Sequence, residues 1–177
     1  MSPIRKIVVV VGSLLVVLIA GAYLLPRQVH VEREALLRAP PSDVFAYVND
    51  FQEFNRWSPW ARIDPDTHYT FENGTRGEGA KMTWNSDHPN VGSGSQEIIE
   101  SVANEHVKVA LEFDGHGQAT AYYRLTPASN GTRLIWGFDT DLGNNPIARY
   151  FGLFFDDMIG ADYDKGLANL QALVERH

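Results

Sequence analysis

The sequence predicts an α+β domain in which a curved antiparallel sheet wraps a long C-terminal helix, with one apolar helix in front of it. Three patterns indicate this fold class. Residues 106–140 alternate between apolar and polar side chains, which is the period of half-buried β-strands. Apolar residues recur every three or four positions after Pro41 and again from Ile147, which is the period of amphipathic helices. A run of 19 residues from Ile7 to Leu25 carries no charge.

The apolar run has two interpretations. As a helix it is about 28 Å long, close to the roughly 30 Å hydrocarbon core of a bilayer, so it predicts a membrane-spanning anchor. It also resembles a cleaved signal peptide, because Arg5 and Lys6 precede it and Ala20-Gly21-Ala22 matches an A-x-A cleavage site. The anchor is favoured because the apolar run continues past that site to Leu25.

Both interpretations place the rest of the chain on the same side of a membrane. The positive charges tightest against the run are Arg5 and Lys6, which favours a cytoplasmic N-terminus. We therefore expect a single-pass membrane protein whose soluble domain lies outside the cytoplasm. Residues 1–28 form the anchor or uncleaved signal, and residues 29–177 form one domain of ordinary size.

Seven β-strands are predicted from residue 29 onward. The last three alternate most regularly and lie near 106–113, 119–125 and 134–140, with a turn at Asn130-Gly131 before the last. The earlier strands are placed at 29–38, 68–72, 80–85 and 94–102, between glycine-rich turns.

Two segments have a helical period. The apolar residues from Pro41 to Phe54 predict an amphipathic helix that is broken into two short pieces near Asp50. The stripe that begins at Ile147 shifts its phase around Gly160, which predicts a long helix bent at that glycine. The order of strand, short helices, further strands and long helix is that of a helix-grip fold. Since a curved sheet and one helix rarely fill the space between them, we expect an apolar cavity, the usual form of a small-molecule site.

The segment "VEREALLRAPPSDVFAYVNDFQEFNRWSPW", followed far downstream by "MIGADYDKGLANLQALVE", resembles the SRPBCC superfamily. This superfamily includes lipid-transfer START domains and aromatic polyketide cyclases. The sequence is most similar to the bacterial polyketide cyclase/dehydrase and lipid transport family, from about Val29 to the C-terminus. The resemblance implies the helix-grip fold and a hydrophobic ligand. It assigns no catalytic residue, because the fold hosts carriers, sensors, enzymes and regulators.

The residues expected to line the cavity are large and apolar, and they come from the short helices, the strands and the C-terminal helix. Because the short helices close one end of such a grip, their aromatic residues either cover the cavity mouth or plug it as packing. The expected set is Phe54, Trp57, Trp60, Met82, Trp84, Val109, Leu111, Phe113, Tyr123, Trp136, Phe151 and Met158.

Asp162 is the one charged residue considered as a polar cavity group. It lies four residues after Met158, on the extension of the apolar stripe. Inside the cavity its carboxyl group would lose solvation and could act as a general acid. The alternative is a solvated carboxylate, or one paired with Lys165 or Arg149. The alternative is favoured, because charged residues are rarely buried without a partner.

Catalytic, metal and nucleic-acid sites are not predicted. The six histidines form no H-x-H or H-E-x-x-H pair and cysteine is absent, so neither a metal site nor a thiol nucleophile is indicated. "GSGSQ" at 92–96 lacks the closing glycine of a nucleophile elbow. Of the 15 Lys and Arg residues two precede Pro26, whereas all 22 Asp and Glu follow it, so the chain from Pro26 on has a formal charge of −9. This charge argues against a nucleic-acid partner.

The sequence thus predicts a membrane-tethered binder of a hydrophobic or amphipathic small molecule, a lipid or a polyketide-like compound, with no cofactor. A polyketide cyclase or dehydratase is the alternative, carried by the family resemblance. A third class is an interaction module whose cavity is filled with side chains. Cavity volume separates the third class from the first two, since a ligand site has a volume of about 300 Å³ or more. The identity of the ligand and the oligomeric state stay open.

Overall fold

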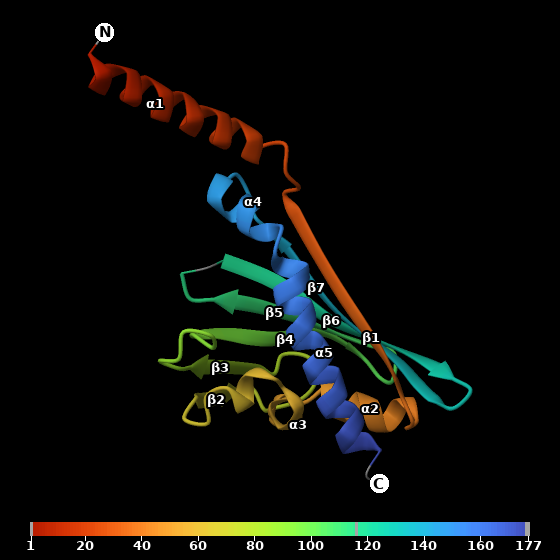
Figure 1. Ribbon diagram of the computed structural model, residues 1–177. Helices are drawn as coiled ribbons and strands as arrows, with labels where there is room; N and C mark the ends of the chain where they lie inside the picture. Colours follow the sequence, from red (N-terminus) through yellow and green to blue (C-terminus); the bar gives the residue numbers. More distant parts are fainter. Residues whose placement is uncertain (1, 116, 176–177) are drawn as a thin grey trace.

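A seven-stranded antiparallel sheet forms the body of the molecule, and one long helix crosses its inner face (Figure 1). The structure is a computed structural model that describes residues 2–115 and 117–175. It confirms the helix-grip fold and the seven predicted strands. The strands are β1 Gln28–Leu37, β2 His68–Glu72, β3 Lys81–Asn85, β4 Gly94–Val102, β5 His106–Phe113, β6 Gly117–Ala128 and β7 Gly131–Asp141.

The sheet order is β1-β7-β6-β5-β4-β3-β2. Strands β2 to β7 therefore form a meander in which each strand pairs with the next. The first strand pairs with the last, with Val31 of β1 opposite Phe138 of β7 and Leu37 opposite Thr132. This pairing places the start of the domain beside its last strand.

The core lies between the inner face of the sheet and the C-terminal helix α5, Phe155–Val174. On the inner face Val107 and Leu134 are fully buried, whereas Lys108 and Arg133 on the outer face are exposed. The buried side chains of α5 are Tyr163, Leu167, Leu170 and Val174. The alternation in the sequence therefore predicts the two faces of the sheet correctly.

Two short helices, α2 Pro41–Val48 and α3 Phe51–Trp57, cover one end of the sheet, and a 3-10 turn, η1 Trp60–Arg62, follows them. The predicted break at Asp50 is confirmed. The side chain of Asp50 accepts a hydrogen bond from the backbone N–H of Gln52 at 2.8 Å, so this residue caps the N-terminus of α3.

The predicted bend at Gly160 is wrong. The break lies earlier, at Leu153 and Phe154, between helix α4, Pro146–Gly152, and α5, which continues through Gly160. The reason for the glycine is steric: a Cβ atom there would lie 1.9 Å from a guanidinium nitrogen of Arg33. The glycine therefore allows a β1 side chain to cross the helix.

An apolar helix, α1 Pro3–Ala22, projects from the domain (Figure 1). Its large aliphatic side chains are exposed to between 46 % and 72 %. Among the helices of the described residues, α1 is the one whose length and composition suit a membrane span. A signal sequence has the same properties, so both interpretations stay open.

Candidate functional site

Aromatic rings from four elements meet between α5 and the sheet. The indole of Trp136 on β7 stacks on Tyr163 of α5, with ring centroids 3.7 Å apart. Trp57 of α3 and Tyr123 of β6 pack on Trp136 at centroid distances of 5.0 and 5.7 Å. All four side chains are at most 4 % exposed. This ring cluster, formed by Trp57, Tyr123, Trp136 and Tyr163, fills one end of the grip.

The aromatic residues of the short helices take different roles. Trp57 is fully buried, and its indole N–H donates to the Tyr47 carbonyl at 3.2 Å, so it acts as packing. Phe54 packs edge-on against Trp57 at 4.9 Å. Trp60 is half-buried and meets Trp136 edge-on at 6.0 Å. Trp60 therefore lies at the rim of the ring cluster.

Polar atoms inside the ring cluster are desolvated. Burial raises the pKa of the Tyr123 and Tyr163 hydroxyls, so both remain neutral at physiological pH. The indole N–H of Trp136 is buried and has no hydrogen-bond acceptor among the described residues. Leaving such a donor unpaired costs about 1–3 kcal/mol.

The predicted residues of β3 to β5 form a second apolar surface on the inner face. Trp84 packs edge-on against Phe113, with centroids 5.9 Å apart. Gly94 lies opposite both residues in the strand between them, and a Cβ atom there would come within 2.7 Å of the indole. The β3–β5 surface consists of buried Met82 and Val109 and of half-buried Trp84, Leu111 and Phe113.

Gln96 lies in the middle of the β3–β5 surface, and the sequence reasoning missed it. The residue is paired with Met82 on one side and Leu111 on the other, and only 8 % of it is exposed. Its amide makes no hydrogen bond within the described part of the chain. The sequence signal for its burial was its position two residues from both Gly94 and Ile98, the other buried positions of β4. A polar group among apolar ones is the usual means of orienting a ligand.

Phe151 and Met158 do not belong to this interior. They are 61 % and 62 % exposed. The helix break at Leu153 and Phe154 changes the helical phase, so Phe155 and Ile159 take the positions that pack on the core. Asp162 forms an ion pair with Lys165 at 2.9 Å, in agreement with the interpretation that the sequence favours.

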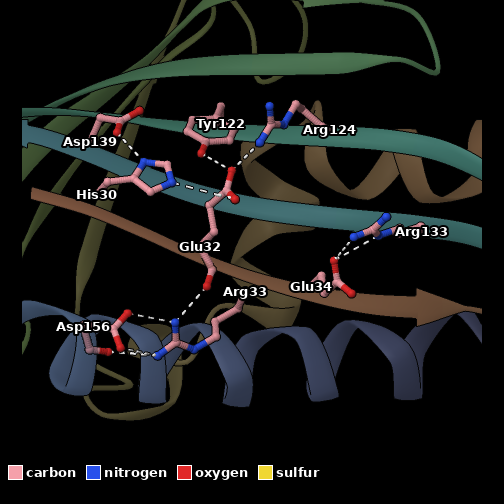
Figure 2. Close-up of polar contacts among 9 residues, drawn as sticks. All are labelled: His30, Glu32, Arg33, Glu34, Tyr122, Arg124, Arg133, Asp139 and Asp156. Atoms are coloured by element: carbon pink, nitrogen blue, oxygen red, sulfur yellow. Dashed lines mark hydrogen bonds and ion pairs between the residues drawn. The ribbon is translucent and has the colours of Figure 1, made fainter.

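A polar network lies on the opposite, outer face of the sheet (Figure 2). The carboxylate of Glu32 on β1 accepts hydrogen bonds from the Tyr122 hydroxyl and the Arg124 guanidinium, both on β6. His30, also on β1, bonds to Asp139 on β7 at 2.7 Å. Tyr122 reaches across β7 because Gly137 lies beneath its ring, where a Cβ atom would come within 2.0 Å of the ring. The outer-face network thus joins the three strands β1, β7 and β6.

The outer-face network shifts the pKa values of its members. The Tyr122 hydrogen bond and the nearby Arg124 hold the pKa of Glu32 below its usual value, against the effect of desolvation. The hydrogen bond to Asp139 raises the pKa of His30. Burial and then Glu32 raise the pKa of Tyr122. No cluster of three or more His, Asp or Glu residues suited to a metal ion occurs within residues 2–115 and 117–175.

A groove with a volume of about 350 Å³ lies on the same outer face. Its volume exceeds the minimum expected of a ligand site, but polar side chains such as Glu97, Glu112 and Asp139 line it. Small-molecule sites are mostly apolar. The β3–β5 surface is therefore the better candidate for a hydrophobic ligand.

Residues 28–175 match the family model for polyketide cyclase / dehydrase and lipid transport proteins. The chain belongs to this family. Membership of the polyketide cyclase/dehydrase and lipid transport family supports a hydrophobic-ligand or polyketide-related role. No curated protein matches the chain.

Solved structures share the fold of this family member at low sequence identity. A protein of unknown function from Staphylococcus aureus matches with a TM-score of 0.64 and 14% identity, over 84% of this chain and 94% of its own. A protein from Chromobacterium violaceum matches with a TM-score of 0.56 and 21% identity, over 82% and 96%. The di-domain ARO/CYC StfQ from the steffimycin biosynthetic pathway matches with a TM-score of 0.62 and 12% identity, over 84% of this chain and 51% of its own.

Proposed function

We propose that the domain binds a hydrophobic or amphipathic small molecule that contacts the β3–β5 surface and Trp60. The observation that carries this proposal is the contrast between the two ends of the grip. The ring cluster is packed solid, whereas Trp84, Leu111 and Phe113 stay half-buried around Gln96. Family membership supports the same class of ligand.

The polar group on this surface suits binding rather than proton transfer. The side-chain amide of Gln96 can donate and accept hydrogen bonds. It does not titrate near neutral pH, whereas a general acid or base works best with a pKa near the operating pH. A ligand with an apolar body and one carbonyl, hydroxyl or carboxylate oxygen fits this amide.

The proposal includes a tether to the membrane through α1. The aliphatic side chains of this helix are exposed over its whole length, as in a helix that faces lipid. A bilayer would supply apolar molecules to a domain held at its surface. The charge of the N-terminal flank favours the side outside the cytoplasm.

A second candidate function has one observation in its favour. The rings of Trp57, Tyr123, Trp136 and Tyr163 occupy the space between α5 and the sheet at one end of the grip. An interaction module with a filled interior would have this packing throughout. The two candidates differ in whether the β3–β5 surface takes up a ligand.

Mass spectrometry of molecules extracted from the purified full chain tests the proposal directly, and titration of tryptophan emission measures the affinity. Trp84→Ala and Gln96→Leu should each weaken binding about tenfold or more, which is about 1.4 kcal/mol. The control is Leu36→Ala, which removes an exposed apolar side chain from the outer face and should leave the affinity unchanged. If extraction yields no ligand and a panel of fatty acids and polycyclic compounds leaves the emission unchanged, the filled module replaces the binder.

A further inference from the structure

An exposed apolar patch covers α4 and the start of α5. Five large side chains form it, and each is between 55 % and 67 % exposed. They are Ile147, Phe151, Leu153, Phe154 and Met158. Ile147 and Phe151 lie one turn apart on α4, Phe154 and Met158 lie one turn apart at the start of α5, and Leu153 lies between the two pairs in the chain. Soluble monomers rarely expose so much contiguous apolar surface without a partner.

The apolar patch is fixed to the C-terminal end of α1. The hydroxyl of Tyr150, next to Phe151 in α4, donates to the carbonyl of Leu18 at 2.8 Å. Tyr150 also lies against Gly21, where a Cβ atom would come within 3.0 Å of the hydroxyl oxygen. Figure 1 shows α4 beside the end of α1 from which the chain continues to β1.

Arg149 strengthens the same junction. Its guanidinium donates to the carbonyls of Tyr23 and Leu25, each at 3.4 Å, and lies 5.2 Å from the centre of the Tyr23 ring. Only 7 % of Arg149 is exposed. Tyrosine rings at the end of an apolar helix are typical of the boundary between lipid and water. The junction of α1 with α4 therefore has the composition of a membrane interface.

The position of Leu18 along α1 sets the depth of the patch. Leu18 lies four residues before the end of the helix at Ala22, which corresponds to about 6 Å along the helix axis. If α1 crosses the bilayer, Tyr150 lies about one helical turn deeper in the lipid than the C-terminal end of α1. Interfacial helices bury their apolar face about 5–10 Å into the boundary between headgroups and acyl chains. The two depths agree.

We propose that the apolar patch inserts into the bilayer that α1 crosses, as a second membrane contact beside the spanning helix. The inference rests on the tether in the proposed function. It adds that α4 and the start of α5 lie in the outer part of the lipid layer, so that α5 leads from the membrane surface into the grip. Asp157 next to the patch is exposed and acidic. Insertion therefore needs no anionic lipid and takes place in a phosphatidylcholine bilayer.

The absence of cysteine from the chain makes a depth measurement direct. Three full-length single-cysteine variants are labelled with an environment-sensitive fluorophore in phosphatidylcholine nanodiscs. Phe154→Cys reports on the patch, Val11→Cys on the middle of α1, and Ala172→Cys on the exposed far end of α5. The quenchers are a lipid with a nitroxide just below its headgroup and iodide in the aqueous phase. The expected result is lipid quenching at position 154 at least about threefold stronger than at position 172, with iodide quenching in the reverse order.

The same design contains the outcomes that overturn the inference. Equal iodide quenching at positions 154 and 172, with position 11 protected from iodide, leaves the tether intact and removes the second contact. Protection of position 154 from both quenchers indicates a protein contact, such as a second copy of the chain, and also overturns it. Iodide quenching at position 11 as strong as at position 172 removes the tether and the patch insertion together.

A second set of variants tests the patch side chains themselves. In a Met158→Cys reporter, the double change Phe151→Ser and Phe154→Ser should abolish lipid quenching at position 158. Leu36→Ser changes a comparably exposed apolar residue on the outer face of the sheet and should leave the quenching unchanged. Retained quenching in the double variant would show that the patch side chains do not hold the helix in the lipid.

Discussion

The guanidinium group of Arg33 lies across the backbone of helix α5 at Gly160. Arg33 donates from Nη1 to a carboxylate oxygen of Asp156 at 3.0 Å and from Nη2 to the Asp156 carbonyl at 3.1 Å. It also donates to the Glu32 carbonyl at 2.8 Å (Figure 2). One arginine on the edge strand thus holds the first turn of α5 against the sheet.

Gly160→Ala should destabilise the domain, although alanine is the better helix former. The new Cβ atom displaces the guanidinium and breaks its bonds to Asp156, which outweighs the gain of up to about 1 kcal/mol in helix propensity. In an Arg33→Ala background the same change should become neutral or stabilising. Denaturant unfolding of the four proteins in this double-mutant cycle measures the sign. An equal effect of Gly160→Ala in both backgrounds would contradict the steric role of Arg33.

The pair of His30 and Asp139 should make stability depend on pH in a defined direction. The pKa of His30 is raised in the folded protein, so its contribution is fully present below the unfolded pKa of about 6.5 and is lost as the pH rises through the folded pKa. The stability of the wild type relative to His30→Gln should therefore fall as the pH rises above about 6.5. Urea unfolding at several pH values measures it, and a constant difference would show that the ionisation of His30 is not coupled to folding.

The ionisation of Glu32 should make the stability of the domain depend on pH in the opposite direction. The pKa of Glu32 is lowered, first by the hydrogen bond from Tyr122. Its contribution is therefore present above the unfolded pKa of about 4.5 and is lost as the pH falls through the folded pKa. Tyr122→Phe removes the donor and should reduce the loss of stability on acidification. Acid titration of the two proteins, followed by circular dichroism, compares them.

Trp57 and Trp60 should differ when each is replaced by alanine. Trp57 is fully buried in the ring cluster, so Trp57→Ala should cost about 3–5 kcal/mol of unfolding free energy. Trp60 is half-buried at the rim, so Trp60→Ala should cost less stability and more ligand affinity. Unfolding and ligand titration on the same two variants give both quantities. Equal losses of affinity would place Trp57, too, at the ligand.

The anchor can be separated from a signal peptide by the mature N-terminus. With α1 uncleaved, the full chain should stay in the membrane fraction after carbonate extraction, because an apolar helix of this length inserts stably. Recovery of a mature chain that begins at Tyr23 would establish the signal peptide and exclude the anchor.

Asp162→Asn should change little. The carboxylate pairs with Lys165 on the surface of α5, and exposed pairs contribute about 0–1 kcal/mol. Ligand affinity should stay within experimental error of the wild type. A tenfold loss without unfolding, about 1.4 kcal/mol, would give Asp162 a role in the site after all.

Local patterns in the sequence predict most of the fold. Alternation identifies the inner face of β5 to β7, and the signals around Asp50 identify the break between α2 and α3. The bend in the C-terminal segment was predicted at the wrong residue, because a glycine within a helical stripe usually indicates a kink. At Gly160 it instead makes space for a side chain from β1, more than a hundred residues earlier in the chain. Periodicity within a segment contains no information about such a distant partner.

The sequence predicts the candidate site only in part, because local patterns do not show which distant residues pack together. Phe54, Trp57, Tyr123 and Trp136 do come together, because large apolar residues on inner faces meet in any packing of this fold. Gln96 was missed because it is a polar residue on an apolar face, and Tyr163 because a residue on an apolar stripe can belong equally to the core or to a cavity wall. Phe151 and Met158 were misplaced, since an apolar residue at a helical spacing looks the same in the sequence whether it faces the core or lies exposed.

The pairing of β1 with β7 determines when the domain can finish folding. β1 begins a few residues after α1, yet its partner is the last strand to be synthesised, with Leu37 opposite Thr132. During synthesis β1 therefore has no pairing partner until β7 is complete, while β2 to β6 can already form their meander. Pairing over such a sequence distance is slow, and an open strand edge is prone to wrong partners. Completion of β7 closes this edge, and only then can α5 cross β1 and place Arg33 over Gly160.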